Sequence, residues 1–188
     1  MALAQTVERA KTLVTAEELW RLSAGDKKYE LVQGELIEMA PPGGTHGNIA
    51  AKMSWLLLNF VKVQNLGEIM VETGFQLASN PDTIRGPDIS FLAAGKVPAG
   101  GIPDGYISGP PDLAIEIVSP GDTASEIQAK VQDYLAYGSR LVWIVYPQQQ
   151  TVVVHYPDRT ARTLQHADTL AGEAVLPGFS CQIQEIFD

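Results

Sequence analysis

The sequence has few of the features that mark specialised classes of protein. Its 188 residues include one cysteine, Cys181, so no disulfide can form within the chain and a reducing, cytoplasmic location is expected. No stretch approaches the roughly 20 consecutive apolar residues of a membrane span, and charges interrupt any apolar run near the N-terminus that could act as a signal peptide. Internal repeats are absent too. We therefore expect one globular domain over residues 1–188, with no membrane association and with residues 1–14 as a flexible arm.

Basic residues are also scarce. Lys and Arg together number 13 against 22 Asp and Glu, which gives a formal net charge of −9. An acidic surface repels phosphate unless a local basic patch or a bound cation overrides it. The charge therefore excludes a protein that coats DNA through its overall charge. The composition, 45% hydrophobic and 19% charged, is typical of a globular protein and excludes general disorder.

The first half of the chain predicts short helices and a hairpin. Thr15 begins a capping box with Glu18, which predicts a helix to about residue 22. A Gln-Gly pair separates two β-forming runs, 28–32 and 35–39, and predicts a hairpin. After the turn-rich segment 41–44, apolar residues recur at helical spacing and predict an amphipathic helix: Ile49, Met53, Leu56, Leu57, Phe60 and Val61.

The second half predicts a parallel strand, helix, strand unit. A helix over 122–137 joins apolar strands at 112–118 and 141–146, and such a unit has a buried central sheet. The loop 93–111 is rich in Gly and Pro, and a loop of this length is usually functional or mobile. The other expected strands are 68–72, 75–78, 88–92 and a final hairpin of 151–156 with 160–164. The predicted fold is α/β, with a mixed β-sheet core flanked by helices and antiparallel hairpins at both ends.

A glutamate within an otherwise apolar strand is the most unusual residue. Glu116 lies on the same face of its strand as Ala114 and Val118, because side chains alternate. A carboxylate that is buried in its ionised form loses much of its hydration energy, so it should be protonated, paired or bound to a cation. The alternative is a strand whose second face meets solvent at this point.

A second carboxylate opens an earlier strand. Asp88 follows Gly86 and Pro87, at a sheet end of the kind where open α/β sheets place ligands. The loop before Glu116 is long enough to bring the two strands side by side. Two carboxylates on neighbouring strands can share a hard cation such as Mg²⁺, which prefers oxygen ligands. Asp88 could equally cap a turn at the start of its strand.

A lysine on the following helix is a third candidate. Lys130 borders the apolar stripe that includes Ile127, Val131 and Tyr134, so its ammonium group could extend past the edge of the core towards a phosphate or an attacking water. Glu126 precedes it by four residues, and a surface ion pair between the two is the alternative.

These features occur in a recognisable order. Gly-Pro-Asp at 86–88 is followed by Leu-Ala-Ile-Glu-Ile-Val-Ser-Pro at 113–120, then by Lys130, then by Tyr-x-x-Tyr-Gly at 134–138 and Val-Trp-Ile-Val at 142–145. The series resembles the PD-(D/E)XK superfamily of restriction-endonuclease-like proteins. It is most similar to the bacterial family of short, stand-alone endonucleases with a displaced catalytic lysine. The resemblance covers nearly the whole chain.

The resemblance implies metal-dependent cleavage of DNA by a homodimer. Asp88 and Glu116 would bind Mg²⁺ or Mn²⁺, and the backbone carbonyl of Ile117 could add a ligand. The superfamily pattern has a lysine two positions after the second acid, where this chain has Val118. The family resembled moves the lysine to the next helix, which matches Lys130.

Two further positions match the family's pattern. Glu30 matches an N-terminal acidic position that some members bring to the metal site, although it could instead pair with Lys28 on the surface. His46 stands in Thr-His-Gly-Asn, which resembles the start of the family's long helix. It could contact a phosphate or a water, or it could only help to end the preceding loop.

Three functions fit these residues. The first is a Mg²⁺-dependent endonuclease acting on DNA, with Asp88, Glu116, Lys130 and Glu30 as its catalytic residues. The second is a catalytically silent module of the same fold that binds a partner or nucleic acid. It fits the acidic charge and the absence, around the Trp143 strand, of an acid and an Asp-Pro that the family commonly has there. The third is a hydrolase that uses the same metal site on a small phosphoester.

Overall fold

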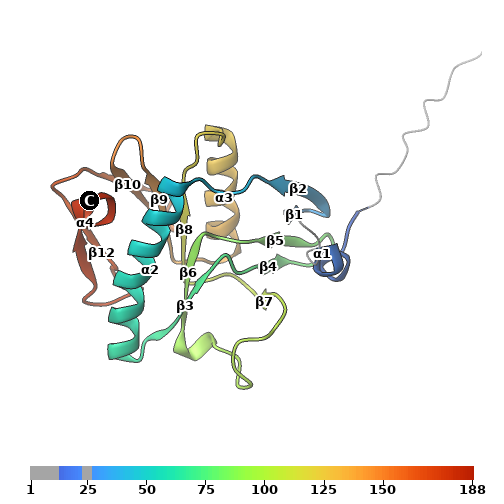
Figure 1. The fold of residues 1–188 in the computed structure, drawn as a ribbon. Helices are drawn as coiled ribbons and strands as arrows, with labels where there is room; N and C mark the ends of the chain where they lie inside the picture. The colour runs from blue at the N-terminus through green and yellow to red at the C-terminus, as the bar shows by residue number, and fades with distance from the viewer. Residues whose placement is uncertain (1–12, 23–26) are drawn as a thin grey trace, which may run out of the picture.

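The computed structural model of the chain describes residues 13–22 and 27–188 (Figure 1). The first twelve residues of the expected arm lie outside this description, whereas Val14 donates its backbone N–H to the carbonyl of Gly34 at 2.8 Å. The elements in chain order are α1 (Ala16–Leu22), β1 (Lys28–Val32), β2 (Glu35–Met39), α2 (Gly44–Gln64), β3 (Gly67–Val71), β4 (Phe75–Ala78), β5 (Thr83–Arg85), β6 (Ile89–Ala93), η1 (Ala94–Lys96), β7 (Ile107–Ser108), β8 (Leu113–Ile117), α3 (Ala124–Tyr137), β9 (Leu141–Tyr146), β10 (Thr151–His155), β11 (Ala161–Leu164), β12 (Thr169–Ala171), β13 (Ser180–Gln182) and α4 (Ile183–Phe187).

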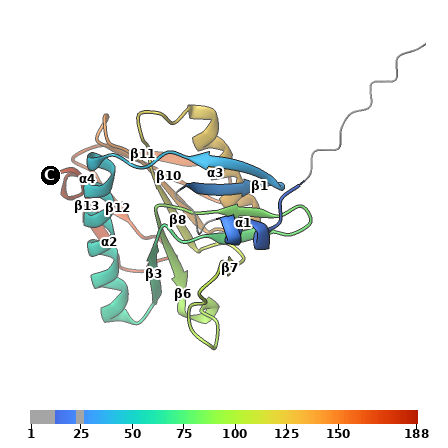
Figure 2. The ribbon, with the colours of Figure 1, turned by 45° about the vertical axis from the view of Figure 1, so that its right-hand side comes forward.

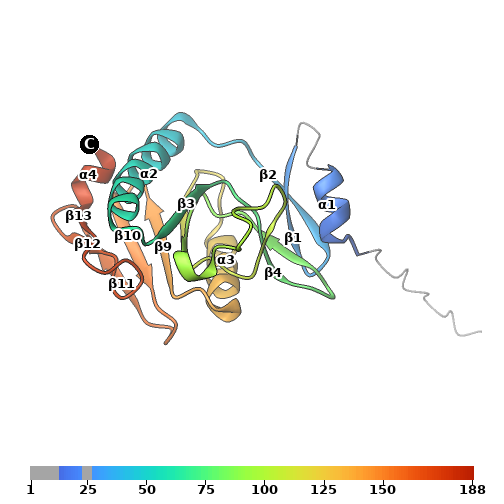
Figure 3. The ribbon, with the colours of Figure 1, turned by 90° about the horizontal axis from the view of Figure 1, so that it is seen from below.

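The strands form two main sheets. The larger sheet has the order β11-β10-β9-β8-β6-β3, and the smaller sheet has the order β2-β1-β5-β4-β7. Within the larger sheet β8 and β9 are parallel, as the sequence predicts, and the other neighbouring strands are antiparallel. The smaller sheet and α1 lie at one end of the molecule, and β12, β13 and α4 lie at the other (Figure 3).

Helices α2 and α3 cover opposite faces of the larger sheet. Leu113, Ile115 and Ile117 of β8 pack with α2 and the C-terminal elements. Ala114, on the other face of the same strand, packs with α3. Figure 2 shows β8 between the two helices. Strand β8 is therefore buried on both sides, and its second face does not meet solvent at Glu116, which is 4% exposed.

Both long helices end at a residue whose backbone is in the left-handed region. Helix α3 begins at a capping box in which Thr123 and Glu126 bond reciprocally, and it ends at Gly138, whose φ of 109° favours glycine. Helix α2 has Gly43 at its N-terminus, with no side-chain cap, and ends at Asn65 in the left-handed region. Within the described ranges, no helix has the length and apolar character needed to cross a membrane.

The structure corrects the expected elements at three places. Residues 83–85, expected to lie outside any strand, form β5, whose three residues are all buried between β1 and β4. The loop 93–111 contains η1 and the two-residue β7. The chain does not finish with the hairpin of β10 and β11, because β12, β13 and α4 follow it and pack on α2. Strands of two or three residues, such as β5, β7, β12 and β13, and a helix of five residues, such as α4, are too short to show a hydrophobic period.

Candidate active site

The two candidate metal-binding acids lie on neighbouring strands. Asp88 directly precedes β6, and Glu116 is the fourth residue of β8. In the antiparallel register of these strands Ile89 is opposite Ile115, so the next step of the register puts Asp88 opposite Glu116. Directly opposed side chains point to the same face of a sheet. The loop 93–111 thus returns the chain as the sequence predicts and places two carboxylates together.

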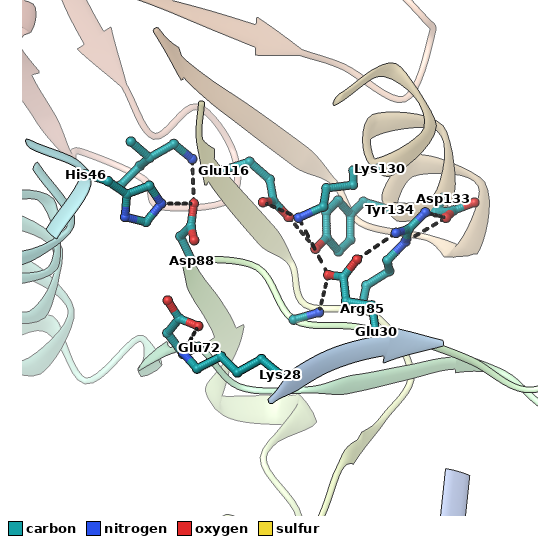
Figure 4. Close-up of polar contacts among 12 residues, drawn as sticks. Lys28, Glu30, His46, Glu72, Arg85, Asp88, Glu116, Lys130, Asp133 and Tyr134 are labelled. Carbon is teal, nitrogen blue, oxygen red and sulfur yellow. Dashed lines mark hydrogen bonds and ion pairs between the residues drawn. The ribbon is translucent and has the colours of Figure 1, made fainter. Parts of the chain in front are cut away.

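Glu116 is buried and has a partner on each carboxylate oxygen (Figure 4). Lys130 Nζ donates to Oε2 at 2.8 Å, and the Tyr134 hydroxyl donates to Oε1 at 2.7 Å. Burial raises the pKa of Glu116 to about 7, against the pull of Lys130 and with help from the charges of Asp88 and Glu30. The carboxyl group is therefore poised to change its protonation state near neutral pH.

Asp88 joins three elements of the fold. Its Oδ2 accepts a hydrogen bond from the backbone N–H of Ile117 at 2.6 Å and lies 3.0 Å from His46 Nε2 on α2. Its Oδ1 takes part in neither contact. The hydrogen bond to Asp88 raises the pKa of His46, although burial opposes the charged form. His46 thus lies beside the candidate metal centre and holds the orientation of Asp88.

Lys130 reaches Glu116 rather than the surface. Its side chain is 12% exposed, and its Nζ lies 3.6 Å from Glu30 Oε1 in addition to its bond with Glu116. Burial works against the charge of Lys130, but the carboxylates of Glu116 and Glu30 outweigh it and raise the pKa of the lysine. Glu126, the alternative partner in the sequence, instead caps the start of α3 through Thr123.

Glu30 is also buried, and its strongest partner is Arg85. Arg85 Nη1 donates to Glu30 Oε2 at 2.7 Å, and the backbone N–H of Gly86 donates to Oε1 at 3.0 Å. Lys28, the surface partner that the sequence suggested, pairs with Glu72 at 2.8 Å. Glu30 therefore faces the candidate site from the smaller sheet.

Sequence reasoning missed two members of this cluster, Arg85 and Tyr134, as polar groups of the site. Arg85 stands in a segment that shows no alternation, and Tyr134 occupies an apolar stripe where its ring belongs to the core. The available signal was the spacing of Lys130 and Tyr134, which are four residues apart and therefore lie on one face of a helix. An acidic strand residue facing that helix needs such donors.

The donor set fits a hard divalent cation. Mg²⁺ takes oxygen ligands, binds through one or two carboxylates and keeps several waters. Asp88 and Glu116 supply the two carboxylates, and they lie directly opposite each other on neighbouring strands. Among the residues that the structure describes, no group of three or more His, Cys, Asp and Glu side chains gathers into a ready cage. The arrangement therefore suits a partly hydrated cation.

Comparisons with known proteins agree with this fold. The Uma2 family profile, described as "Putative restriction endonuclease", matches residues 16–184. No curated protein matches the chain. A crystal structure from Anabaena variabilis ATCC 29413, described as a putative nuclease belonging to DUF820, matches with a TM-score of 0.82 and 22% identity over 93% of this chain and 97% of that chain. This likeness confirms the restriction-endonuclease-like fold. Because the profile matches most of its length, the chain belongs to the Uma2 family of restriction-endonuclease-like proteins.

Proposed function

We propose that the protein is a metal-dependent endonuclease that hydrolyses DNA phosphodiester bonds. The observation that carries this proposal is the pair of opposed carboxylates, the partly exposed Asp88 and the buried Glu116, with Lys130 bonded to Glu116. Membership of a family whose profile is described as "Putative restriction endonuclease" supports a nuclease function in general. The Anabaena protein of the same fold is described as a "putative nuclease".

Some of these residues would bind a cation, and others would contact the substrate or position their neighbours. Asp88 and Glu116 would hold Mg²⁺ or Mn²⁺, with the backbone carbonyl of Ile117 as a further ligand. When bound, such an ion polarises a phosphate oxygen and lowers the pKa of a water. Lys130 would turn from Glu116 towards the substrate. There it would orient the attacking water and stabilise the negative charge that develops on the phosphate. His46 would fix Asp88, and Glu30 would support Lys130.

The acidic character of the chain makes the cation necessary for binding as well as for chemistry. The net charge of −9 repels a phosphodiester backbone, and a divalent ion offsets the negative charge at the site. We therefore expect DNA binding at the site to depend on the metal. A catalytically silent module would instead bind its partner with or without the ion.

We also propose that two copies associate through the outer face of α2. Trp55 and Val63 are 66% and 77% exposed on this helix, and a hollow between them is lined by Phe60 and Phe179. Helix α2 contains no acidic residue, and Lys52 lines a second hollow beside Trp55 together with Glu185 of α4, so the helix itself adds no repulsion between acidic groups of two copies. In a two-fold contact, Trp55 of each copy could fill the hollow of the other. Each copy has one site, so the two sites of the dimer would each cut one strand of the DNA.

Plasmid nicking tests the proposed activity. Wild-type protein is incubated with supercoiled DNA and Mg²⁺, Mn²⁺ or EDTA, beside Glu116→Gln and Lys130→Met purified in the same way. We expect cleavage that requires the metal and falls by about 10²–10⁴-fold in Lys130→Met, the range for loss of a proton-transfer or charge-stabilising group. Cleavage in EDTA, or undiminished cleavage by Glu116→Gln, would contradict the proposal. Turnover of a chromogenic phosphodiester without cleavage of DNA would favour a small phosphoester as substrate.

A further inference from the structure

The guanidinium of Arg85 is the most buried cation of the described residues and links two distant parts of the fold. Its Nη1 donates to Glu30 Oε2 on β1, while its Nε and Nη2 donate to Asp133 Oδ2 on α3 at 2.9 and 2.6 Å. Arg85 is 4% exposed. We call Glu30, Arg85 and Asp133 the Arg85 clamp. It ties the smaller sheet to the helix that covers the larger sheet.

The clamp acts on the same helix face that serves the candidate site. Lys130 and Tyr134 flank Asp133 on α3, and each of them holds one oxygen of Glu116. Because Arg85 fixes Asp133, it also fixes the height and rotation of the turn that carries Lys130 and Tyr134. Figure 4 shows Arg85 on the far side of Tyr134 from Glu116, so Arg85 reaches Glu116 only through these neighbours.

The clamp also occupies Glu30. Its Oε2 accepts from Arg85, and its Oε1 accepts from Gly86 and lies 3.6 Å from Lys130. Glu30 would have to give up these partners to bind a cation. Glu116 would also have to release Lys130 or Tyr134, but it lies directly opposite Asp88, whereas Glu30 comes from the smaller sheet. Asp88 retains Oδ1 outside both of its contacts and has the more exposed side chain, at 16% against 5% for Glu30.

The charge balance of the cluster favours a single divalent ion. The four carboxylates of Glu30, Asp88, Glu116 and Asp133, with Glu116 counted as ionised, face the cationic groups of Arg85 and Lys130. The excess is two negative charges when His46 is neutral and one when it is protonated. Buried charge is tolerated when it is compensated nearby. A single divalent cation supplies that compensation.

We propose that Arg85 is a positioning residue, which sets Lys130 and Glu116 through Glu30 and Asp133, and that the site binds one divalent cation without using Glu30 as a ligand. This proposal rests on the proposed function. In this proposal Glu30 holds Lys130 and Arg85 in place and does not bind the metal. It also makes the junction of the two sheets a part of the active site.

Titration with Mn²⁺ in a calorimeter tests the proposal without any need for activity. The three variants are Glu30→Gln, Arg85→Lys and Asp133→Asn. Arg85→Lys keeps the positive charge but loses the planar, forked guanidinium group. Asp133→Asn changes a more exposed residue of the Arg85 clamp and is the variant least expected to disturb folding. Arg140→Lys is the matched control. It makes the same change in an arginine that lies near Asp112, at the opposite end of β8. Circular dichroism at the titration temperature establishes that each variant is folded.

We expect one Mn²⁺ per chain in wild type and in Glu30→Gln. Arg85→Lys and Asp133→Asn should bind Mn²⁺ about 10–100-fold more weakly, the usual effect of losing a group that orients metal ligands. Arg140→Lys should bind as wild type does. With DNA as substrate, saturating Mn²⁺ and equal concentrations of folded protein, Arg85→Lys should lower kcat and leave KM unchanged, because it removes an interaction that acts in the transition state. A mere loss of stability would not change kcat per folded molecule.

Each contrary result has a distinct meaning. Two ions in wild type and one in Glu30→Gln would make Glu30 a ligand, which overturns this inference but keeps the proposed function. Unchanged Mn²⁺ affinity in folded Arg85→Lys and Asp133→Asn would overturn the positioning role. No Mn²⁺ bound to wild type would overturn this inference and remove the metal basis of the proposed function as well.

Discussion

Glu116 shows at the scale of one residue how burial sets chemistry. Its pKa is raised by burial and by the neighbouring carboxylates of Asp88 and Glu30, while Lys130 opposes the shift. The same carboxyl group accepts a hydrogen bond on each oxygen. A proton and a divalent cation can each relieve the excess negative charge, so we expect them to compete. Binding of Mn²⁺ should therefore strengthen as pH rises through about 7.

The raised pKa also predicts how Glu116 affects stability. Between about 4.5 and 7 the folded protein binds more protons at this residue than the unfolded chain does, so its contribution to stability falls as pH rises through that window. We expect the free energy of unfolding of wild type, minus that of Glu116→Gln, to fall by on the order of 1–3 kcal/mol from about pH 4.5 to about pH 8. Urea denaturation in EDTA measures it. A difference that stays constant with pH would show that Glu116 has an ordinary pKa.

Tyr134 offers a second test at this scale. Tyr134→Phe keeps the buried ring but removes the hydroxyl that donates to Glu116 at 2.7 Å. A buried carboxylate that loses a hydrogen bond costs about 1–3 kcal/mol, so the free energy of unfolding should fall by that amount. Tyr137→Phe, on the exposed side of the same helix, is the control and should be neutral. Equal stability of the two variants would contradict the importance of this bond.

At the scale of elements, the sequence predicts the site where residues show a period. Alternation along β8 puts Glu116 on the face of Ala114, and the helical spacing of α3 puts Lys130 beside the core. The structure has both features. The pairing of Arg85 with Glu30 and Asp133 could not be predicted, because its members are 55 and 48 residues apart and β5 is too short to show a pattern.

The start of α3 allows a test at this scale. Thr123 and Glu126 form its capping box, and the helix carries Lys130, Asp133 and Tyr134 into the site. Thr123→Ala should lower the free energy of unfolding by about 1 kcal/mol, as is usual for loss of a cap. Because the Arg85 clamp holds the middle of the helix, Mn²⁺ affinity should change little. A large loss of Mn²⁺ affinity would show that the cap, rather than the clamp, positions Lys130.

At the scale of the whole molecule, the candidate site lies where the two sheets meet. Asp88 and Glu116 belong to the larger sheet, whereas Glu30 and Arg85 come from the smaller one. The sequence could identify the candidate acids, through their strand positions and through the resemblance, but not the junction that surrounds them. A hairpin of β1 and β2 is a local feature, and its packing against α3 is a long-range one.

The proposed association of two copies belongs to this scale as well. Trp55→Glu places a charge on the outer face of α2, which otherwise carries no acid. We expect wild type to have the mass of a dimer in light scattering and Trp55→Glu to have the mass of a monomer. Trp20→Glu makes the same change on α1, where Trp20 is 49% exposed, and this control should stay dimeric. A wild-type monomer, or a dimer in both variants, would contradict an interface on α2.

The most direct test of the metal centre is an anomalous scattering experiment on crystals soaked in Mn²⁺. We predict one peak, in contact with a carboxylate oxygen of Asp88 and one of Glu116, and no peak at that place in Asp88→Asn crystals treated in the same way. A peak held by other residues, or no peak in wild type at saturating Mn²⁺, would contradict the assignment of these two acids as the metal-binding pair.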